Sequence, residues 1–405
     1  MTAIPAVRVP LRRVLALGGL SALGPLSLDL YLPALPALTA DLRASESASQ
    51  LSLSLCMIGL ALGQLFVGPL TDRVGRRIPL LVGQTLFVLT AGLCALAPSI
   101  GPLLVLRLLG GLAGGTGIVV ARAMVRDLYA GPALARVFAL LMLVMGVAPI
   151  GAPLLGGLLL RFTSWRGLFA ALAVLGIVLL VGAATLGETL PADRRRAGGL
   201  RTTAAALRSV LRDRTFLVPA LVGAVGVCGM FVYIAMASYV LQDTYGLSAQ
   251  QFAYVFGANA VAILLAGRAS AGLVGRVGAA RLLTTGVVVA LVAAVAMLVG
   301  VLVSGSVWVL LAPLLVFVGC TGVLLPNATA LALDGQGSAA GTASAVFGLL
   351  QFAIGAAVPP LASLGGVTVV VMAVTILATA AVTALIRFGL GPLPGPAAHS
   401  AAEGA

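Results

Sequence analysis

The sequence has little charge, and this shortage excludes a soluble globular protein. Only 9% of the 405 residues are charged, whereas 61% are hydrophobic, and the mean hydropathy is +1.17. Soluble domains contain about 25% charged residues and about 45–50% apolar residues. Because helices satisfy their own backbone hydrogen bonds in lipid, we predict an all-α polytopic membrane protein.

Lysine is absent, and acids are few. All 24 basic residues are arginines, against 11 acidic residues, which gives a net charge of +13. Such a balance can indicate nucleic-acid binding, but these arginines lie at the ends of apolar runs and form no patch interleaved with aromatic residues. We therefore expect a lipid bilayer, and no nucleic acid, as the partner of this charge.

Histidine and cysteine are too sparse for metal or redox chemistry. The single histidine, His399, lies near the C-terminal end, and the four cysteines are widely spaced inside apolar runs. We interpret the cysteines as small apolar side chains, not as a disulfide framework or a metal site. Candidate Asp, His or Ser residues for an intramembrane enzyme do not converge in the sequence. We expect no enzymatic activity, no cofactor and no metal.

Long uncharged runs predict twelve membrane spans, because one crossing of the hydrocarbon core requires about 20 apolar residues. Two runs are long enough for a pair of helices each, hinged near 304–306 and near 364–366. The first run resembles a signal peptide, but its length and its acid, Asp29, indicate that it is retained. The spans lie within Val14–Pro33, Glu46–Asp72, Arg77–Arg107, Arg107–Ala123, Arg136–Arg161, Arg166–Glu188, Arg214–Asp243, Asp243–Arg268, Arg281–Asp334 (two) and Asp334–Arg387 (two).

The longest polar connection divides these spans into two six-helix bundles. We predict an N-terminal bundle at 1–190, a cytoplasmic linker at 191–214, a C-terminal bundle at 215–388 and a disordered cytoplasmic tail at 389–405. Two bundles joined by a linker are typical of transporters built from parallel repeats. Placing both termini in the cytoplasm leaves only Arg43, Arg161 and Arg166 outside, as the positive-inside rule requires. We expect a multi-pass protein of the cytoplasmic (inner) membrane.

The turn between the second and third spans carries a specific motif. The segment 68–77, GPLTDRVGRR, resembles the signature loop of the major facilitator superfamily, G-x-L-x-D-R-x-G-R-[RK]. The resemblance implies the major facilitator fold, with twelve helices in two bundles, and a cytoplasmic latch. The residues assigned to this latch are Gly68, Asp72, Arg73, Gly75, Arg76, Arg77 and Asp127.

Within the latch, each residue type suggests a role. Gly68 permits close approach of a neighbouring helix, and Asp72 can cap a helix N-terminus. We expect Arg76 to pair with Asp127, and Asp72 to face the start of span eleven near 341–342. The matching stretch of the second half, 267–281, keeps Gly272, Arg276 and Gly278 but has no acid. A basic turn that only sets topology is the alternative interpretation.

Three further motifs narrow the resemblance. The segment 103–111 is similar to the superfamily's span-four motif with a buried arginine, Arg107, although Gly110 replaces the usual glutamine. The segment 121–127 and the element Asp29-x-Tyr31-x-Pro33 resemble the bicyclomycin-resistance (Bcr/CflA) branch of twelve-span drug:proton antiporters. The remaining motif resembles the span-five motif associated with antiporters and contains Gly146, Pro149, Gly151, Pro153, Gly156 and Gly157.

Asp29 and Arg107 are the candidate proton-coupling residues. A charged carboxylate is costly within a bilayer, so it normally faces the bundle interior or a wet cavity and has a function that needs ionisation. We predict that Asp29 carries the proton and that substrate and proton compete for this one group. Arg107 should favour the charged form of Asp29 when the two side chains are close. The alternative is that Asp29 only hydrogen-bonds neighbouring backbone near the outer mouth.

The substrate is the least determined feature. A small amphipathic, drug-like compound, neutral or weakly cationic, fits the scarcity of acids, with protons as the second partner and the monomer as the working unit. Uptake symport or metabolite export on the same fold remains the alternative, as do channel or structural roles. The cavity candidates, each equally consistent with helix-to-helix hydrogen bonding, are Tyr31, Gln64, Tyr233, Asn259, Asn327 and Gln351.

Overall fold

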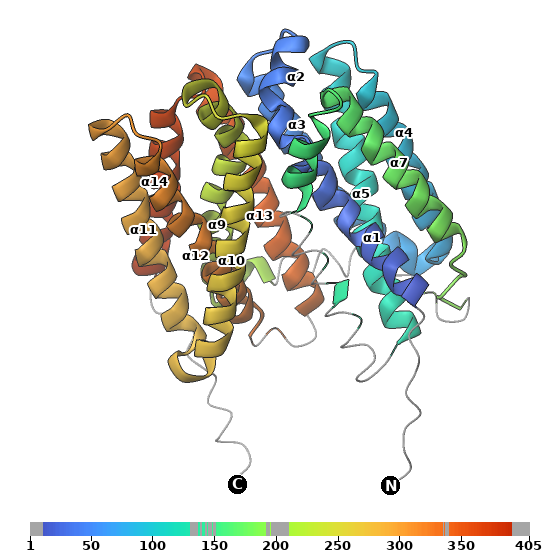
Figure 1. The fold of residues 1–405 in the computed structure, drawn as a ribbon. Helices are drawn as coiled ribbons and strands as arrows, with labels where there is room; N and C mark the ends of the chain where they lie inside the picture. Colours follow the sequence, from blue (N-terminus) through green and yellow to red (C-terminus); the bar gives the residue numbers. More distant parts are fainter. Residues whose placement is uncertain are drawn as a thin grey trace, which may run out of the picture. The chain divides into compact units, whose positions relative to one another are not determined.

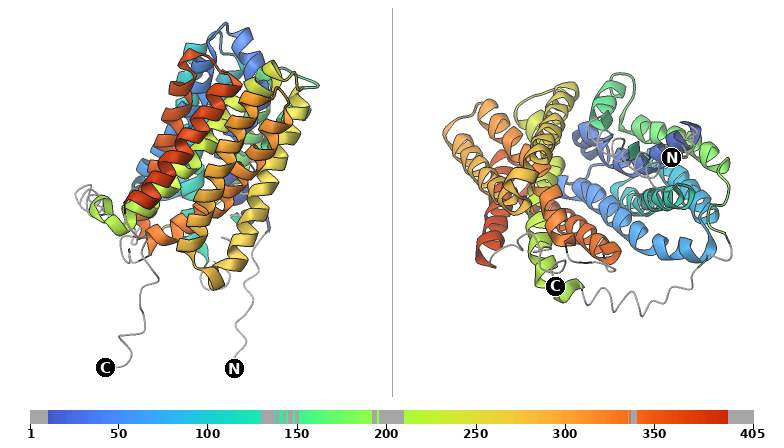
Figure 2. Two further views of the ribbon diagram at one scale, coloured as in Figure 1. Left: turned by 90° about the vertical axis from the view of Figure 1, so that its left-hand side faces the viewer. Right: turned by 90° about the horizontal axis from the view of Figure 1, so that it is seen from below.

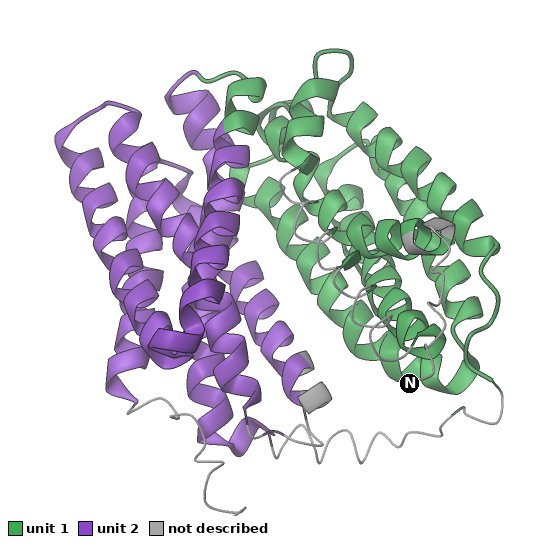
Figure 3. Ribbon diagram, turned by 60° about the horizontal axis from the view of Figure 1, so that its bottom comes forward, with its two compact units in different colours: residues 1–198, 247–254 green, residues 199–246, 255–405 purple. Residues whose placement is uncertain are grey.

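The structure is a computed structural model. It describes residues 11–129, 137, 140–141, 144, 148, 151–191, 195, 210–334, 336 and 340–390. The chain forms two compact units, residues 1–198 with 247–254 and residues 199–246 with 255–405 (Figure 3).

The first unit is built on long apolar helices that pack side by side. Helix α5 lies against α1, α3 and α4, and α7 lies against α4 (Figure 1). The helices are α1 (Leu11–Asp29), the 3-10 turn η1 (Leu32–Ala34), α2 (Leu35–Asp41), α3 (Glu46–Val74), α4 (Arg77–Ala95), α5 (Ile100–Leu128) and α7 (Trp165–Ala184).

The second unit is also built from long apolar helices that pack side by side. Helix α9 lies against α12, α13 and α14, and α11 lies against α12 and α14, as the left view of Figure 2 shows for the red helix α14. The elements are α9 (Arg214–Tyr239), the π-helical turn η3 (Val240–Thr244), α10 (Ala249–Val277), α11 (Ala279–Val303), α12 (Trp308–Leu333), α13 (Ala340–Ala362), the 3-10 turn η5 (Ser363–Gly365) and α14 (Val369–Gly389). The start of α10, up to Tyr254, belongs to the first unit.

The predicted all-α class and the hinges are confirmed. In the described residues, 11 helices are long and apolar enough to cross a membrane. The chain turns between α11 and α12 at 304–307, and between α13 and α14 at 363–368, where two helices had been predicted within one uncharged run. Within the predicted span between Arg136 and Arg161, the structure describes residues 137, 140–141, 144, 148 and 151–160. Most of the predicted linker and most of the tail fall outside the described residues.

Two helices extend beyond the uncharged runs that predicted their spans. Helix α3 continues past Asp72 to Val74, and α10 continues past Arg268 to Val277. The charged residues of these turns are therefore partly helical. A single long polar side chain at a helix end does not interrupt the i→i+4 hydrogen bonds, so charge marks the membrane surface better than it marks the end of a helix.

Small residues let α3 and α5 approach closely. A Cβ atom built at Gly59 or Gly63 on α3 would overlap the carbonyl oxygen of Leu108 or Leu112 on α5. Gly111 and Gly115 of α5 meet the α3 backbone in the same way. Both pairs follow the small-x-x-x-small spacing that brings membrane helices into backbone contact. This contact fixes the height of Arg107, which lies one turn before Gly111.

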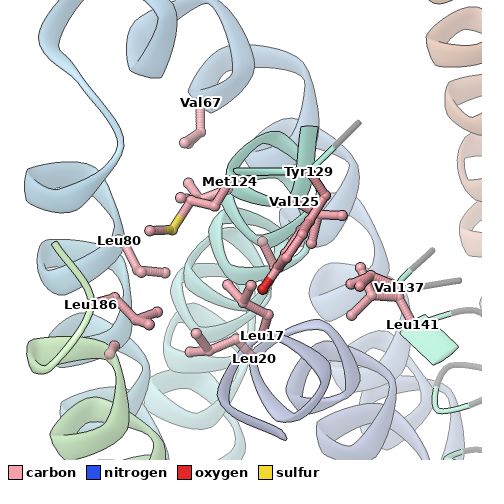
Figure 4. Close-up of a cluster of buried hydrophobic side chains, with 13 residues drawn as sticks. Leu17, Leu20, Val67, Leu80, Met124, Val125, Tyr129, Val137, Leu141 and Leu186 are labelled. Carbon is pink, nitrogen blue, oxygen red and sulfur yellow. The ribbon is translucent and has the colours of Figure 1, made fainter. Parts of the chain in front are cut away.

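A buried apolar cluster closes the other end of this unit. Leu17 and Leu20 of α1 lie in it with Val125 of α5 and with Tyr129 just after α5 (Figure 4). Leu186, which follows α7, packs into the same cluster. The segment that follows α7 is therefore packed against α1 and α5 of this unit.

Candidate functional site

The first span is interrupted beside its acid. The candidate span covers Leu15–Asp41, a stretch of 27 residues, but α1 ends at Asp29 and the chain continues through η1 and α2. Pro33 and Pro36 occupy the first turns of these two elements, where proline supplies no N–H donor and ends the preceding helix. Asp29 thus lies near the middle of the span.

Arg107 lies at the centre of a polar and aromatic cluster, defined here as the arginine cluster: Arg107, Tyr31, Ser52 and Phe169. The arginine is only 4% exposed, and its Cζ atom lies 4.7 Å from the centre of the Tyr31 ring and 5.6 Å from that of Phe169. Its Nε donates to the Ser52 carbonyl oxygen at 3.4 Å. Cation–π contact with two rings stabilises a desolvated guanidinium in place of a carboxylate.

Tyr31 connects the break in α1 to α3. Its hydroxyl lies 2.7 Å from Ser52 Oγ, and its ring lies 5.1 Å from that of Phe169. Tyr31 is fully buried, so neighbouring residues surround its side chain and fix its position. Of the predicted residues, Asp29, Tyr31 and Arg107 are brought together in one unit.

Asp29 is buried but not fixed by a partner. It is 8% exposed, and it interacts electrostatically with Arg107 without forming an ion pair. Within the part of the chain that the structure describes, no hydrogen bond to the Asp29 carboxylate is present. The alternative interpretation, a carboxylate bonded to neighbouring backbone, has no support in this geometry. A carboxylate without a fixed partner is free to bind a proton or a ligand.

Sequence reasoning missed Ser52 and Phe169. The sequence offered only a weak indication of either residue. Ser52 is one of several serines at the start of α3, and Phe169 is one of few aromatic residues in its span. Neither position is distinctive alone, because only the packing of α3, α5 and α7 shows that they share Arg107.

The antiporter motif contacts the break in α1. A Cβ atom built at Gly156 would overlap the carbonyl oxygen of Leu30, the residue after Asp29, and would approach Pro33. No described residue outside its own helix lies within 4 Å of a Cβ atom built at Gly151 of the same motif, and Pro153 is also described. Gly157 faces Ala253 within the same unit. Gly146 and Pro149 lie outside the described residues.

The predicted pair of Arg76 and Asp127 is present. Arg76 Nε donates to Asp127 Oδ2 at 3.0 Å, while Nη1 donates to Asp72 Oδ1 at 2.6 Å and to Thr71 Oγ1 at 2.7 Å. Burial lowers the pKa of the guanidinium, but the hydrogen bonds to Asp127 and Asp72 raise it, and the net pKa lies above its ordinary value. Arg76 therefore joins α5 to the end of α3.

Loss of Asp127 is expected to destabilise the protein more than loss of Asp72. The Asp127 side chain is 17% exposed and that of Asp72 is 54% exposed, so only the first leaves Arg76 without a partly buried counter-charge. We expect Asp127→Asn to cost about 1–3 kcal/mol and Asp72→Asn less than about 1 kcal/mol. Thermal unfolding in detergent measures both variants. Equal shifts in melting temperature would contradict this order.

Two expectations for the latch are wrong. Asp72 does not cap a helix N-terminus, since it lies in the last turn of α3 and accepts from Arg76. Gly68 is not required for close approach, because a Cβ atom there would make only ordinary contact with Val119 at 3.7 Å. The side chains at 341–342, predicted to face Asp72, lie outside the described residues. Arg73 and Arg77 flank the turn as expected.

The candidate cavity residues of the second unit are bonded between helices. Asn259 donates to the Tyr233 hydroxyl at 2.9 Å, and the Tyr233 ring stacks on Phe256. Asn327 donates to Ser270 Oγ and to the carbonyl oxygen of Val323, both at 2.7 Å. Gln351 of α13, also in the second unit, is half-buried. In the first unit, Gln64 donates to the carbonyl oxygen of Leu60 in its own helix at 3.3 Å. A role in substrate contact stays a prediction for these residues.

Curated relatives resemble the chain along most of its length. It is 39% identical over 381 residues to the "Uncharacterized MFS-type transporter YdgK" of Bacillus subtilis, covering 92% of this chain and 94% of that protein. It is 30% identical to the "Bicyclomycin resistance protein homolog" of Haemophilus influenzae, covering 85% and 86%. It is 31% identical to "Multidrug resistance protein D" of Escherichia coli, covering 82% and 83%. The predicted resemblance to the bicyclomycin-resistance branch is confirmed.

Solved structures share the fold. A D-xylose-proton symporter matches with a TM-score of 0.71 at 18% identity over 95% of this chain and 98% of that one. A nucleoside transporter matches with a TM-score of 0.72 at 13% identity over 93% and 98%. The family model for the Major Facilitator Superfamily matches residues 17–360. The chain is therefore a membrane transporter, not an enzyme, and it belongs to the Major Facilitator Superfamily.

Proposed function

We propose that the chain exports small amphipathic, drug-like compounds in exchange for protons. The observation that carries this proposal is Asp29, a buried carboxylate at the break in α1 that has no fixed partner among the described residues and lies beside the charged Arg107. The names of two relatives, which refer to bicyclomycin and multidrug resistance, support export of an antibiotic-like substrate.

The exchange follows from the two charge states of Asp29. When protonated, the carboxyl group is tolerated in a closed, dry site, and when charged it attracts a cationic or hydrogen-bonding substrate. Proton and substrate then compete for one group, which couples their movements. The membrane potential supplies about 2.3 kcal/mol per 100 mV for each charge moved.

The setting of this cycle is also part of the proposal. Both termini lie in the cytoplasm, as the arginine distribution favours, and the latch around Arg76 then lies on the cytoplasmic side. The transporter works as a monomer in the cytoplasmic membrane. A cavity between α-helices, with no cofactor or metal, holds the substrate.

The direct test uses purified protein in liposomes of defined pH. No gradient of the dye or drug is imposed. An imposed acid gradient alone should drive accumulation of the compound, and an uncoupler should abolish this accumulation. Transport that ignores both the gradient and the uncoupler would contradict proton coupling. Proton movement in the same direction as substrate would instead support uptake symport, the alternative on this fold.

The cavity candidates are tested by a pair of variants. Gln351→Ala removes a half-buried amide and should change the relative resistance to different compounds without lowering the amount of protein. Asn327→Ala removes two bonds that join α12 to α10 and to its own helix, and it should lower the melting temperature. Susceptibility panels and thermal unfolding separate the two effects. An unchanged spectrum in Gln351→Ala would remove that residue from the cavity.

A further inference from the structure

Glu188, beyond the end of α7, binds the start of α4. Its Oε1 accepts the backbone N–H of Arg76 at 2.8 Å, and its Oε2 accepts that of Arg77 at 3.2 Å. Oε1 also accepts the N–H groups of Thr189 and Leu190, both at 3.0 Å, which turns the chain around the carboxylate. Both oxygens are thus used, and a carboxylate at a helix N-terminus also interacts favourably with the helix dipole.

The next residue binds the ion pair itself. Thr189 Oγ1 donates to Asp127 Oδ2 at 3.0 Å, the same oxygen that accepts from Arg76 Nε at 3.0 Å. Arg77 Nη2 donates to the Ala184 carbonyl oxygen at the end of α7 at 3.4 Å. The end of α7 and the residues after it therefore contact the backbone of the latch turn, the side chain of Asp127 and the side chain of Arg77.

The turn has the shape that this contact requires. Gly75 has φ 99°, in the region that favours glycine, and a Cβ atom there would overlap Glu188 Oε2 and lie 3.1 Å from Arg195 Nη2. The glycine of the motif therefore leaves room for the carboxylate as well as permitting the turn. In the second unit, Gly278 between α10 and α11 has φ 85° but open space around it.

The carboxylate is held in its charged form. Burial raises the pKa of Glu188, but the N–H groups of Arg76, Leu190, Arg77 and Thr189 lower it, and the net pKa lies below its ordinary value. The stabilisation is therefore complete above the ordinary pKa of a glutamate, and it is lost only as pH falls through the lowered value. At neutral pH the contact is intact.

We propose that Glu188 and Thr189 are positioning residues of the latch, which tie the start of the segment between the two units to Arg76 and Asp127. The ion pair and the segment after α7 then release or engage together. The proposal adds a partner that the signature motif does not contain. Its transport consequence rests on the proposed function, but its structural consequence does not.

Hydrogen exchange of the full-length protein in detergent tests the structural consequence. In Glu188→Ala, the amides of Arg76 and Arg77 should exchange about 5- to 30-fold faster than in the unaltered protein, the factor expected for loss of a helix cap. In Glu188→Gln, which keeps one acceptor oxygen, the exchange rates of these amides should lie between those of Glu188→Ala and those of the unaltered protein. Unchanged exchange at both amides in Glu188→Ala would overturn the proposal.

Asp213→Asn is the matched control. Asp213 is also a carboxylate with a lowered pKa at a helix start, where Oδ1 accepts from Thr215 N at 2.9 Å, but it caps α9 in the second unit. This variant should leave exchange at Arg76 and Arg77 unchanged. Acceleration by both variants would show general loosening of the fold and would overturn the specific role of Glu188.

Transport kinetics test the positioning role. Glu188→Ala and Thr189→Val should lower the maximal efflux rate and leave the half-saturating substrate concentration unchanged, because neither residue contacts the arginine cluster. Purified protein of matched melting temperature in liposomes gives both constants. If the unaltered protein shows no proton-driven efflux, the proposed function fails while the exchange result still stands. If the maximal rate is unaffected in Glu188→Ala, the positioning role fails.

Discussion

Asp29→Asn is expected to abolish efflux driven by a proton gradient. Asparagine has nearly the same size and shape as aspartate, so the break in α1 and the arginine cluster should persist. It can neither bind nor release a proton in the working pH range, so the site is locked in a neutral state. Rates measured in liposomes with an imposed acid gradient should fall to those of protein-free liposomes.

Substrate binding should behave differently from transport in this variant. The neutral side chain resembles protonated Asp29, so binding of a neutral substrate should remain, and its pH dependence should disappear. Binding measured at several pH values, beside transport, separates a lost proton carrier from a damaged fold. Efflux with the same rate and pH dependence as the unaltered protein would refute the assignment of Asp29.

Asp41→Asn is the control for this experiment. Asp41 ends the same candidate span, but its side chain is 50% exposed and accepts from Arg166 Nη2 at 3.0 Å and from Trp165 Nε1 at 3.1 Å. It is thus a paired surface acid, unlike Asp29. Neutralising it should leave proton-driven efflux intact, which shows that the effect at Asp29 depends on position and not on the loss of any carboxylate.

The sequence was sufficient for the parts of the site that involve an unusual residue in an apolar run. Asp29 and Arg107 are identifiable because a charge in a membrane span is costly and rarely without function. The ion pair of Arg76 with Asp127 was predictable for a related reason, since a motif supplies one partner and a nearby acid the other. The first span was predicted to end at Pro33, close to the end of α1 at Asp29, but its continuation through η1 and α2 to Asp41 was not predicted.

The parts that sequence could not provide depend on packing between distant elements. The backbone carbonyl oxygen of Ser52 accepts a hydrogen bond from Arg107, and any residue type would supply such a carbonyl. Glu188 was interpreted only as the end of a span, because no pattern shows that a carboxylate more than a hundred residues from Arg76 reaches its N–H group. Such contacts follow from the crossing of helices, which periodicity alone does not determine.

The glycines of the antiporter motif are expected to differ sharply in their tolerance of a methyl group. Gly156→Ala places a Cβ atom on the carbonyl oxygen of Leu30, which is backbone and cannot rotate away. The overlap can be relieved only by separating the motif helix from α1, at a cost of about 1–3 kcal/mol. Because Leu30 follows Asp29, the shift should also displace the acid and change the pH dependence of efflux.

Gly151→Ala is the matched variant, since it introduces the same methyl group on the same segment, where no atom of another described segment lies within 4 Å of the new atom. It should retain the melting temperature and the efflux rate of the unaltered protein. Comparison of the two variants therefore separates contact with α1 from a general demand for glycine in the motif. If both fail alike, the motif acts through its own flexibility; if only Gly156→Ala fails, and its pH profile shifts, the motif acts by holding the break that carries Asp29.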